Sequence, residues 1–160
     1  MRRGEMRARR VGVSGASMPD DESAGETGPI DTDVLRRIVR RLATSNRFVE
    51  MSYRPDAAPN AVVADYDTGY VPAAIDRAYL RIRWFETDDF SIHYSEQYRN
   101  GANWECRWDR HPNDHNTRDH FHPPPDAAKP GEDASHAVNW RDVLTQVLTE
   151  LDEHVQALWE

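Results

Sequence analysis

Alternation of apolar and polar side chains over three successive segments constrains the fold of this chain most strongly. The segments are residues 80–85, 90–95 and 104–109, and the short turn sequences Asp88-Asp89 and Asn100-Gly101 separate them. Because successive side chains of a β-strand point to opposite faces, this pattern predicts an antiparallel β-meander with one buried and one polar face. The buried face would carry Leu80, Ile82, Trp84, Phe90, Ile92, Tyr94, Trp104, Cys106 and Trp108. The polar face would carry Arg81, Arg83, His93, Glu105 and Arg107.

Weaker signals extend this meander towards the N-terminus. Residues 47–54 and 61–66 are rich in strand-forming side chains, and prolines follow the first of these segments. On the C-terminal side, residues 111 to about 136 contain many prolines and show no periodicity, so we expect an irregular segment there. Together these segments predict about four to five strands.

Two amphipathic segments predict one helix at each end of the domain. Asp31 or Thr32 can cap a helix that continues to about Asn46. Asn139 can cap a final helix whose apolar residues fall on one stripe. The sequence therefore predicts an α+β fold, in which the antiparallel β-meander packs against an N-terminal and a C-terminal helix.

The N-terminal region differs from the rest of the chain in composition and charge. Residues 1–29 lack apolar periodicity and are expected to form a disordered tail before a single α+β domain at residues 30–160. Residues 1–17 hold five Arg and one Glu, whereas the formal net charge of the whole chain is −8. This contrast indicates either a misassigned start, with Met18 as an alternative first residue, or a disordered basic arm.

The overall composition limits the class of protein and its surroundings. No apolar stretch reaches the roughly 20 residues that span a bilayer, and the single Cys106 fits a reducing compartment, so we expect a cytoplasmic protein. Nineteen of the twenty basic residues are Arg, which with the Asp excess suggests a halophile-like or GC-rich source. The acidic balance argues against bulk attraction to nucleic acid but permits a local groove lined by arginine.

The segment most able to carry chemistry is residues 108–122, which holds four His, three Asp and two Arg. Three interpretations remain open. His111, His115, His120 and His122, with a carboxylate such as Asp114, could bind zinc or a similar ion, although their spacing matches no established motif. Alternatively, the histidines could carry out metal-free acid–base chemistry, or they could belong to a polar loop without a function.

The acid–base interpretation needs few groups. One imidazole can remove a proton while another donates one, because imidazole titrates near neutrality. His93 is predicted on the same polar face and joins the candidates. Arg81, Arg83, Arg107 or Arg118 could hold a phosphate and stabilise the charge that builds up during transfer. Cleavage of RNA by its own 2′-hydroxyl group requires only these imidazole and guanidinium groups.

Three stretches of the chain resemble the TumE family of small toxin-like proteins. They are AYLRIRWFETDDFSIHYSEQY, NWECRWDRHPNDHNTRDHFHPPP and NWRDVLTQVLTEL, which together cover about residues 78–155. The residues that fall on the family's motif positions are Arg107, Asp109, His111, His120 and His122. The chain departs from the family pattern at His111-Pro-Asn, where the family has an asparagine and paired histidines, and at Asp119, where it has a proline.

The resemblance implies the toxin half of a type II toxin–antitoxin pair, with a cognate DNA-binding antitoxin as partner and RNA as substrate. Our leading hypothesis is a TumE-like toxin that acts as a metal-independent ribonuclease. His120, His122, His111 and His93 are its catalytic candidates, and Arg81, Arg83, Arg107 and Asp109 are its substrate-binding candidates. The alternatives are a non-catalytic module that binds a partner or a metal, and a degenerate toxin that has lost activity.

Overall fold

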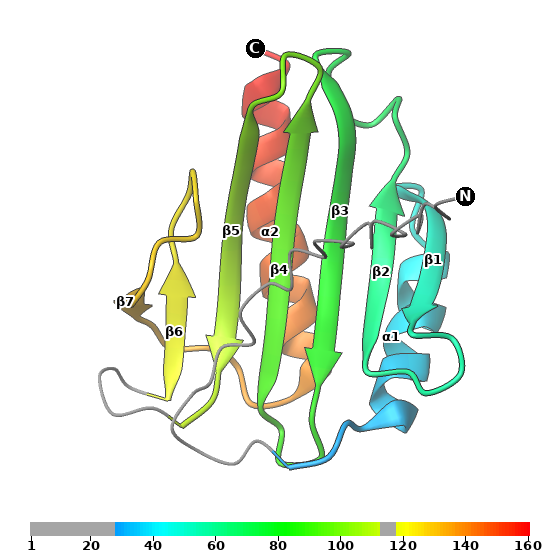
Figure 1. The fold of residues 1–160 in the computed structure, drawn as a ribbon, viewed down its shortest axis with the longest axis vertical. Helices are drawn as coiled ribbons and strands as arrows, with labels where there is room; N and C mark the ends of the chain where they lie inside the picture. The colour runs from blue at the N-terminus through cyan, green and yellow to red at the C-terminus, as the bar shows by residue number, and fades with distance from the viewer. Residues whose placement is uncertain (1–27, 113–117) are drawn as a thin grey trace, which may run out of the picture.

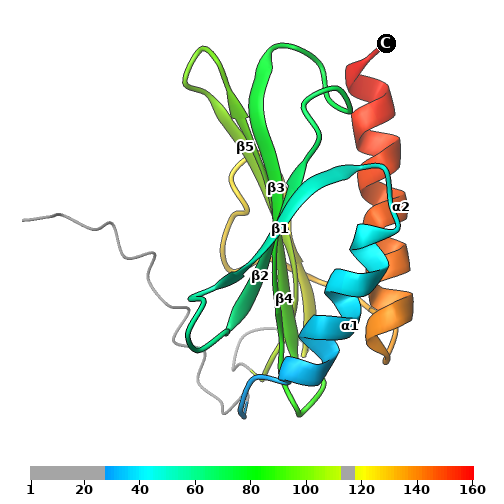
Figure 2. The ribbon, with the colours of Figure 1, turned by 90° about the vertical axis from the view of Figure 1, so that its right-hand side faces the viewer.

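The computed structural model describes residues 28–112 and 118–160 and shows one antiparallel sheet with two helices on one face (Figures 1 and 2). The elements in chain order are α1 (Thr32–Ala43), β1 (Phe48–Arg54), β2 (Ala61–Tyr66), β3 (Ile75–Trp84), β4 (Phe90–Tyr98), β5 (Asn103–Arg110), β6 (Asp119–His122), β7 (Glu132–Asp133) and α2 (Trp140–Leu158). The sheet order is β1-β2-β3-β4-β5-β6-β7, so each strand pairs with its neighbour in the chain. The α+β class and the meander are therefore confirmed.

The centre of the sheet follows the alternation of the sequence. Ile82 of β3 pairs with Ile92 of β4, and Ile92 pairs with Trp108 of β5. All three side chains are buried in the same hydrophobic core. Gly101, with a φ of +87°, occupies the turn between β4 and β5, where a residue without Cβ adopts this backbone at little cost.

Both helices cover the face of the sheet that carries the apolar residues, as the edge-on view shows (Figure 2). The helix α1 begins where the sequence predicts, because the Asp31 side chain accepts a hydrogen bond from the Val34 backbone N–H at 3.0 Å. The Asn139 side chain caps α2 in the same way through the Asp142 N–H. Neither described helix combines the length and the apolar character that a bilayer-crossing segment requires.

The prediction of four to five strands is wrong, because the sheet has seven. The two additional strands, β6 and β7, lie in the segment that we expected to be irregular. Their sequences, DHFH and ED, hold too few apolar residues to produce a recognisable alternation. Most of the predicted tail, residues 1–27, lies outside the described residues, and the disorder expected there remains a prediction.

Candidate functional site

Two rows of polar side chains cross strands β3 to β6 on the face opposite the helices. Residues paired directly across antiparallel strands share a face, so the register identifies the members of each row. The first row consists of Arg81, His93, Arg107 and His122. The second row consists of Arg83, Ser91, Asp109 and His120. Both rows alternate along their strands with core residues, so their side chains lie on the face away from the core.

The carboxylate of Asp109 lies at the centre of the candidate site. Its Oδ2 atom accepts a hydrogen bond from Arg107 Nε at 2.7 Å and lies 3.1 Å from His122 Nε2. His120 Nε2 is 3.5 Å and His111 Nε2 is 3.8 Å from the same oxygen atom. We call these five residues the Asp109 centre. One buried carboxylate thus contacts or faces three imidazoles and one guanidinium group.

Backbone carbonyls set the orientation of two of these rings. His122 Nδ1 lies 3.0 Å from the Ala128 carbonyl oxygen, and His111 Nδ1 lies 3.2 Å from that of Pro112. A carbonyl oxygen can only accept, so each Nδ1 carries the proton and donates it. The Nε2 atom of each ring faces Asp109 Oδ2, and it can donate to this carboxylate only when the ring carries a second proton.

Asp109 is ionised despite its burial. Burial by itself would raise the pKa of its carboxyl group, because it removes water from the charged form. The hydrogen bonds with His120 and His122 and the charge of Arg107 outweigh this effect and hold the pKa well below its usual range. The Asp109 carboxyl group therefore stays ionised at neutral pH.

The candidate side chains differ widely in their access to solvent. The side chains of His120 and His122 are each 2% exposed, and that of Arg107 is 19% exposed. Arg81 is exposed, and Arg83 is partly buried. The structure brings His111, His120, His122 and Arg107 together, whereas Arg81 and Arg83 lie two strands away, roughly 10 Å at the usual strand spacing.

His93 lies between Arg81 and Arg107 in the first row and binds Glu105. Its Nε2 atom is 3.1 Å from Glu105 Oε2. Burial lowers the pKa of His93, and the charge of Arg107 acts in the same direction, while Glu105 opposes both. His93 is accordingly neutral at neutral pH.

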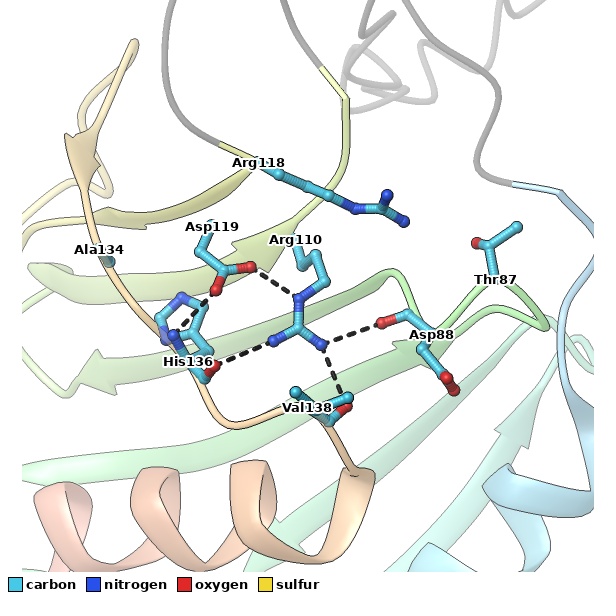
Figure 3. Close-up of a pocket in the computed structure, with 8 residues that line it drawn as sticks. All are labelled: Thr87, Asp88, Arg110, Arg118, Asp119, Ala134, His136 and Val138. Atoms are coloured by element: carbon cyan, nitrogen blue, oxygen red, sulfur yellow. Dashed lines mark hydrogen bonds and ion pairs between the residues drawn. The ribbon is translucent and has the colours of Figure 1, made fainter.

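A hollow on the other side of β5 and β6 holds a second polar group that our reading of the sequence missed (Figure 3). Arg110 donates to Asp119 Oδ1 at 2.6 Å and to the carbonyl oxygens of His136 and Val138. These bonds tie the end of β5 to the chain that leads into α2. Arg110 follows Asp109 directly, so strand alternation alone could have placed it on the helix side.

Three of the described residues could hold a metal ion, namely Asp109, His111 and His120, whose ligand atoms lie within 4.8 Å of one another. This set differs from the one suggested by the sequence. His115 lies outside the described residues, and Asp109 joins the two histidines instead.

Comparison with known families supports the resemblance noted from the sequence. The family model described as Toxin TumE matches residues 35–155, which include all seven strands and the Asp109 centre. Neither the curated proteins nor the solved structures gave a match.

Gly131 lies close to the His122 ring, and Gly101 provides a matched control for this contact. A Cβ at Gly131 would lie 2.9 Å from the Phe121 carbonyl oxygen and 3.1 Å from His122 Nδ1, whereas a Cβ at Gly101 would meet nothing within 4 Å. Both glycines have positive φ, so Ala at either position costs about 1–2 kcal/mol. We expect Gly131→Ala to lower the free energy of unfolding by at least about 1 kcal/mol more than Gly101→Ala in urea titrations. Equal losses would contradict a close contact at His122.

Proposed function

Since the chain belongs to the TumE toxin family and is thus the toxin of a toxin–antitoxin system, we propose that it acts on RNA through the His and Arg side chains of its polar face. Membership also implies an antitoxin partner, and we propose that this partner binds DNA.

The observation that carries the proposal is that Arg107 lies between two imidazoles. Direct pairing places His93 on one side of Arg107 and His122 on the other. Arg107 Nη2 lies 3.1 Å from His122 Nε2. A guanidinium group between two groups that can exchange protons matches what phosphoryl transfer requires, because the phosphate gains negative charge while protons move on both of its sides.

In this proposal the RNA supplies its own nucleophile. One imidazole accepts the proton of a 2′-hydroxyl, whose oxygen attacks the adjacent phosphorus. The bond from phosphorus to the 5′-oxygen breaks, and the second imidazole donates a proton to that leaving oxygen. The products are a 2′,3′-cyclic phosphate and a free 5′-hydroxyl. His93 is suited to accept the first proton, because its lowered pKa keeps the ring neutral.

Arginine side chains beyond the reacting centre would hold the neighbouring phosphates. Arg81 continues the first row towards the middle of the sheet and is exposed. Arg83 lies on the same face, two residues further along β3. Contacts between arginine and phosphate supply most of the affinity of non-specific nucleic-acid binding, and they act locally on a chain whose net charge is −8.

A second candidate function is binding without turnover, and the burial of two histidines favours it. With side-chain exposures of 2% each, His120 and His122 meet solvent very little. In this alternative, the Asp109 centre supports a surface that recognises a partner, and the chain retains the toxin fold without cleaving RNA.

Phosphate binding by Arg81 can be tested with a charge reversal and a matched control. We expect Arg81→Glu to weaken the binding of single-stranded RNA and to reduce the slope of log affinity against log salt by about one. Arg37→Glu makes the same change at an exposed residue of α1, on the opposite layer, and should leave binding nearly unchanged. Equal losses in the two variants, measured by fluorescence anisotropy, would contradict a site on the polar face.

Turnover by the first row can be tested by removing each imidazole. We expect His93→Gln and His122→Gln each to slow cleavage of total RNA by about 10²- to 10⁴-fold and to relieve growth arrest on induction. His154→Gln is the control, because His154 binds Glu96 on the helix side and lies outside both rows. If His122→Gln keeps its circular dichroism spectrum and cleaves like the wild type, the catalytic assignment fails. If the wild type binds RNA without cleaving it, the second candidate function holds.

A further inference from the structure

The Asp109 centre brings ring nitrogens close to a buried carboxylate oxygen. The His111 ring donates through Nδ1 to the Pro112 carbonyl, so its neutral form faces Asp109 Oδ2 with a lone pair on Nε2 at 3.8 Å. A ring nitrogen and a carboxylate oxygen that face each other at this separation can both bind one cation. This arrangement therefore offers ligand atoms to a metal ion.

An unsatisfied atom in the same centre points to a ligand. Asp109 Oδ1 and His120 Nδ1 are buried and have no hydrogen-bond partner among the described residues. The residues themselves are each only 1% exposed. Because buried polar atoms are nearly always paired, the unpaired Asp109 Oδ1 indicates a bound species, and a cation that contacts both oxygens of this carboxylate would satisfy it. His120 Nδ1 would stay unpaired, because that ring faces Asp109 through Nε2.

The separations of the nitrogen and oxygen atoms suit a small transition cation. Ligands at 2.0–2.2 Å from a tetrahedral zinc ion lie about 3.3 Å from one another. The distances from Asp109 Oδ2 to His120 Nε2 and His111 Nε2 are 3.5 and 3.8 Å, so small movements would close the site. The His111 ring also shows a feature common in metal ligands, which is a second ring nitrogen that donates to a backbone carbonyl.

We propose that Asp109, His111 and His120 bind one divalent transition cation of the zinc class. Two imidazoles and one carboxylate form a ligand set that zinc accepts and that leaves a coordination position open. His122 stays outside the set, because its Nε2 atom is within hydrogen-bond distance of Arg107. The cation would link His111, which follows β5, to strand β6. This link would fix the position of His122 beside Arg107. Its binding does not require RNA, so this proposal goes beyond the function proposed above.

Titration of the full, untagged chain with Zn²⁺ after treatment with a chelator tests the proposal. Calorimetry should give one ion per chain, and Co²⁺ should produce visible absorption bands that Zn²⁺ displaces. His111→Ala should weaken binding at least about tenfold, since loss of even an indirect support of a metal site costs this much. His154→Gln should bind like the wild type.

The two variants distinguish loss of the cation site from loss of the fold. The His111 side chain is 12% exposed and lies beyond the end of β5, so its removal should leave the circular dichroism spectrum unchanged. Asp109→Asn serves as a second variant and should also abolish the Co²⁺ bands. Binding by folded His111→Ala at wild-type affinity, or no stoichiometric binding by the wild type, would overturn the proposal. A wild type that binds zinc but does not cleave RNA would refute only the proposed function.

Discussion

The buried carboxylate of Asp109 is the constraint on which the candidate site depends. An ionised group that is 1% exposed must be compensated by nearby donors or cations, because burial of an unpaired charge costs several kcal/mol. Arg107 comes from the same strand, whereas His120 and His122 come from β6. Pairing of β5 with β6 therefore does more than extend the sheet, since it supplies the groups that keep Asp109 charged. This requirement gives a physical reason for a short polar strand at this position.

The other face of the same two strands holds the site in place. Arg110 and Asp119 pair across β5 and β6 and point away from the Asp109 centre. Arg110 also donates to backbone carbonyls just before α2, so one guanidinium group links the edge of the sheet to the helix layer. Beneath the polar rows, Ile92 and Trp108 belong to the core that both helices cover. Rigid packing below and hydrogen bonds at the edge thus orient the polar face.

The sequence predicted the parts of this architecture that hydrophobic burial determines. Alternation identified β3, β4 and β5 and the polar face, and side-chain capping identified Asp31 and Asn139 as helix starts. The sequence could not predict β6, because the segment DHFH contains one apolar residue. The register of β6 depends on polar contacts. For the same reason, only the family resemblance indicated Asp109. Its partners lie 11 and 13 residues later in the chain, beyond the reach of any local pattern.

Long-range ¹H–¹⁵N correlation spectra of the histidine rings, recorded on metal-free protein, test the central role of Asp109 most directly. The ring nitrogen signals of wild-type protein are compared with those of Asp109→Asn, which keeps the size of the side chain but removes its charge. If Asp109 organises the site, the signals of His111, His120 and His122 all shift, while those of His154 on the helix side stay in place. Unchanged signals from the first three rings in a folded variant would contradict the account.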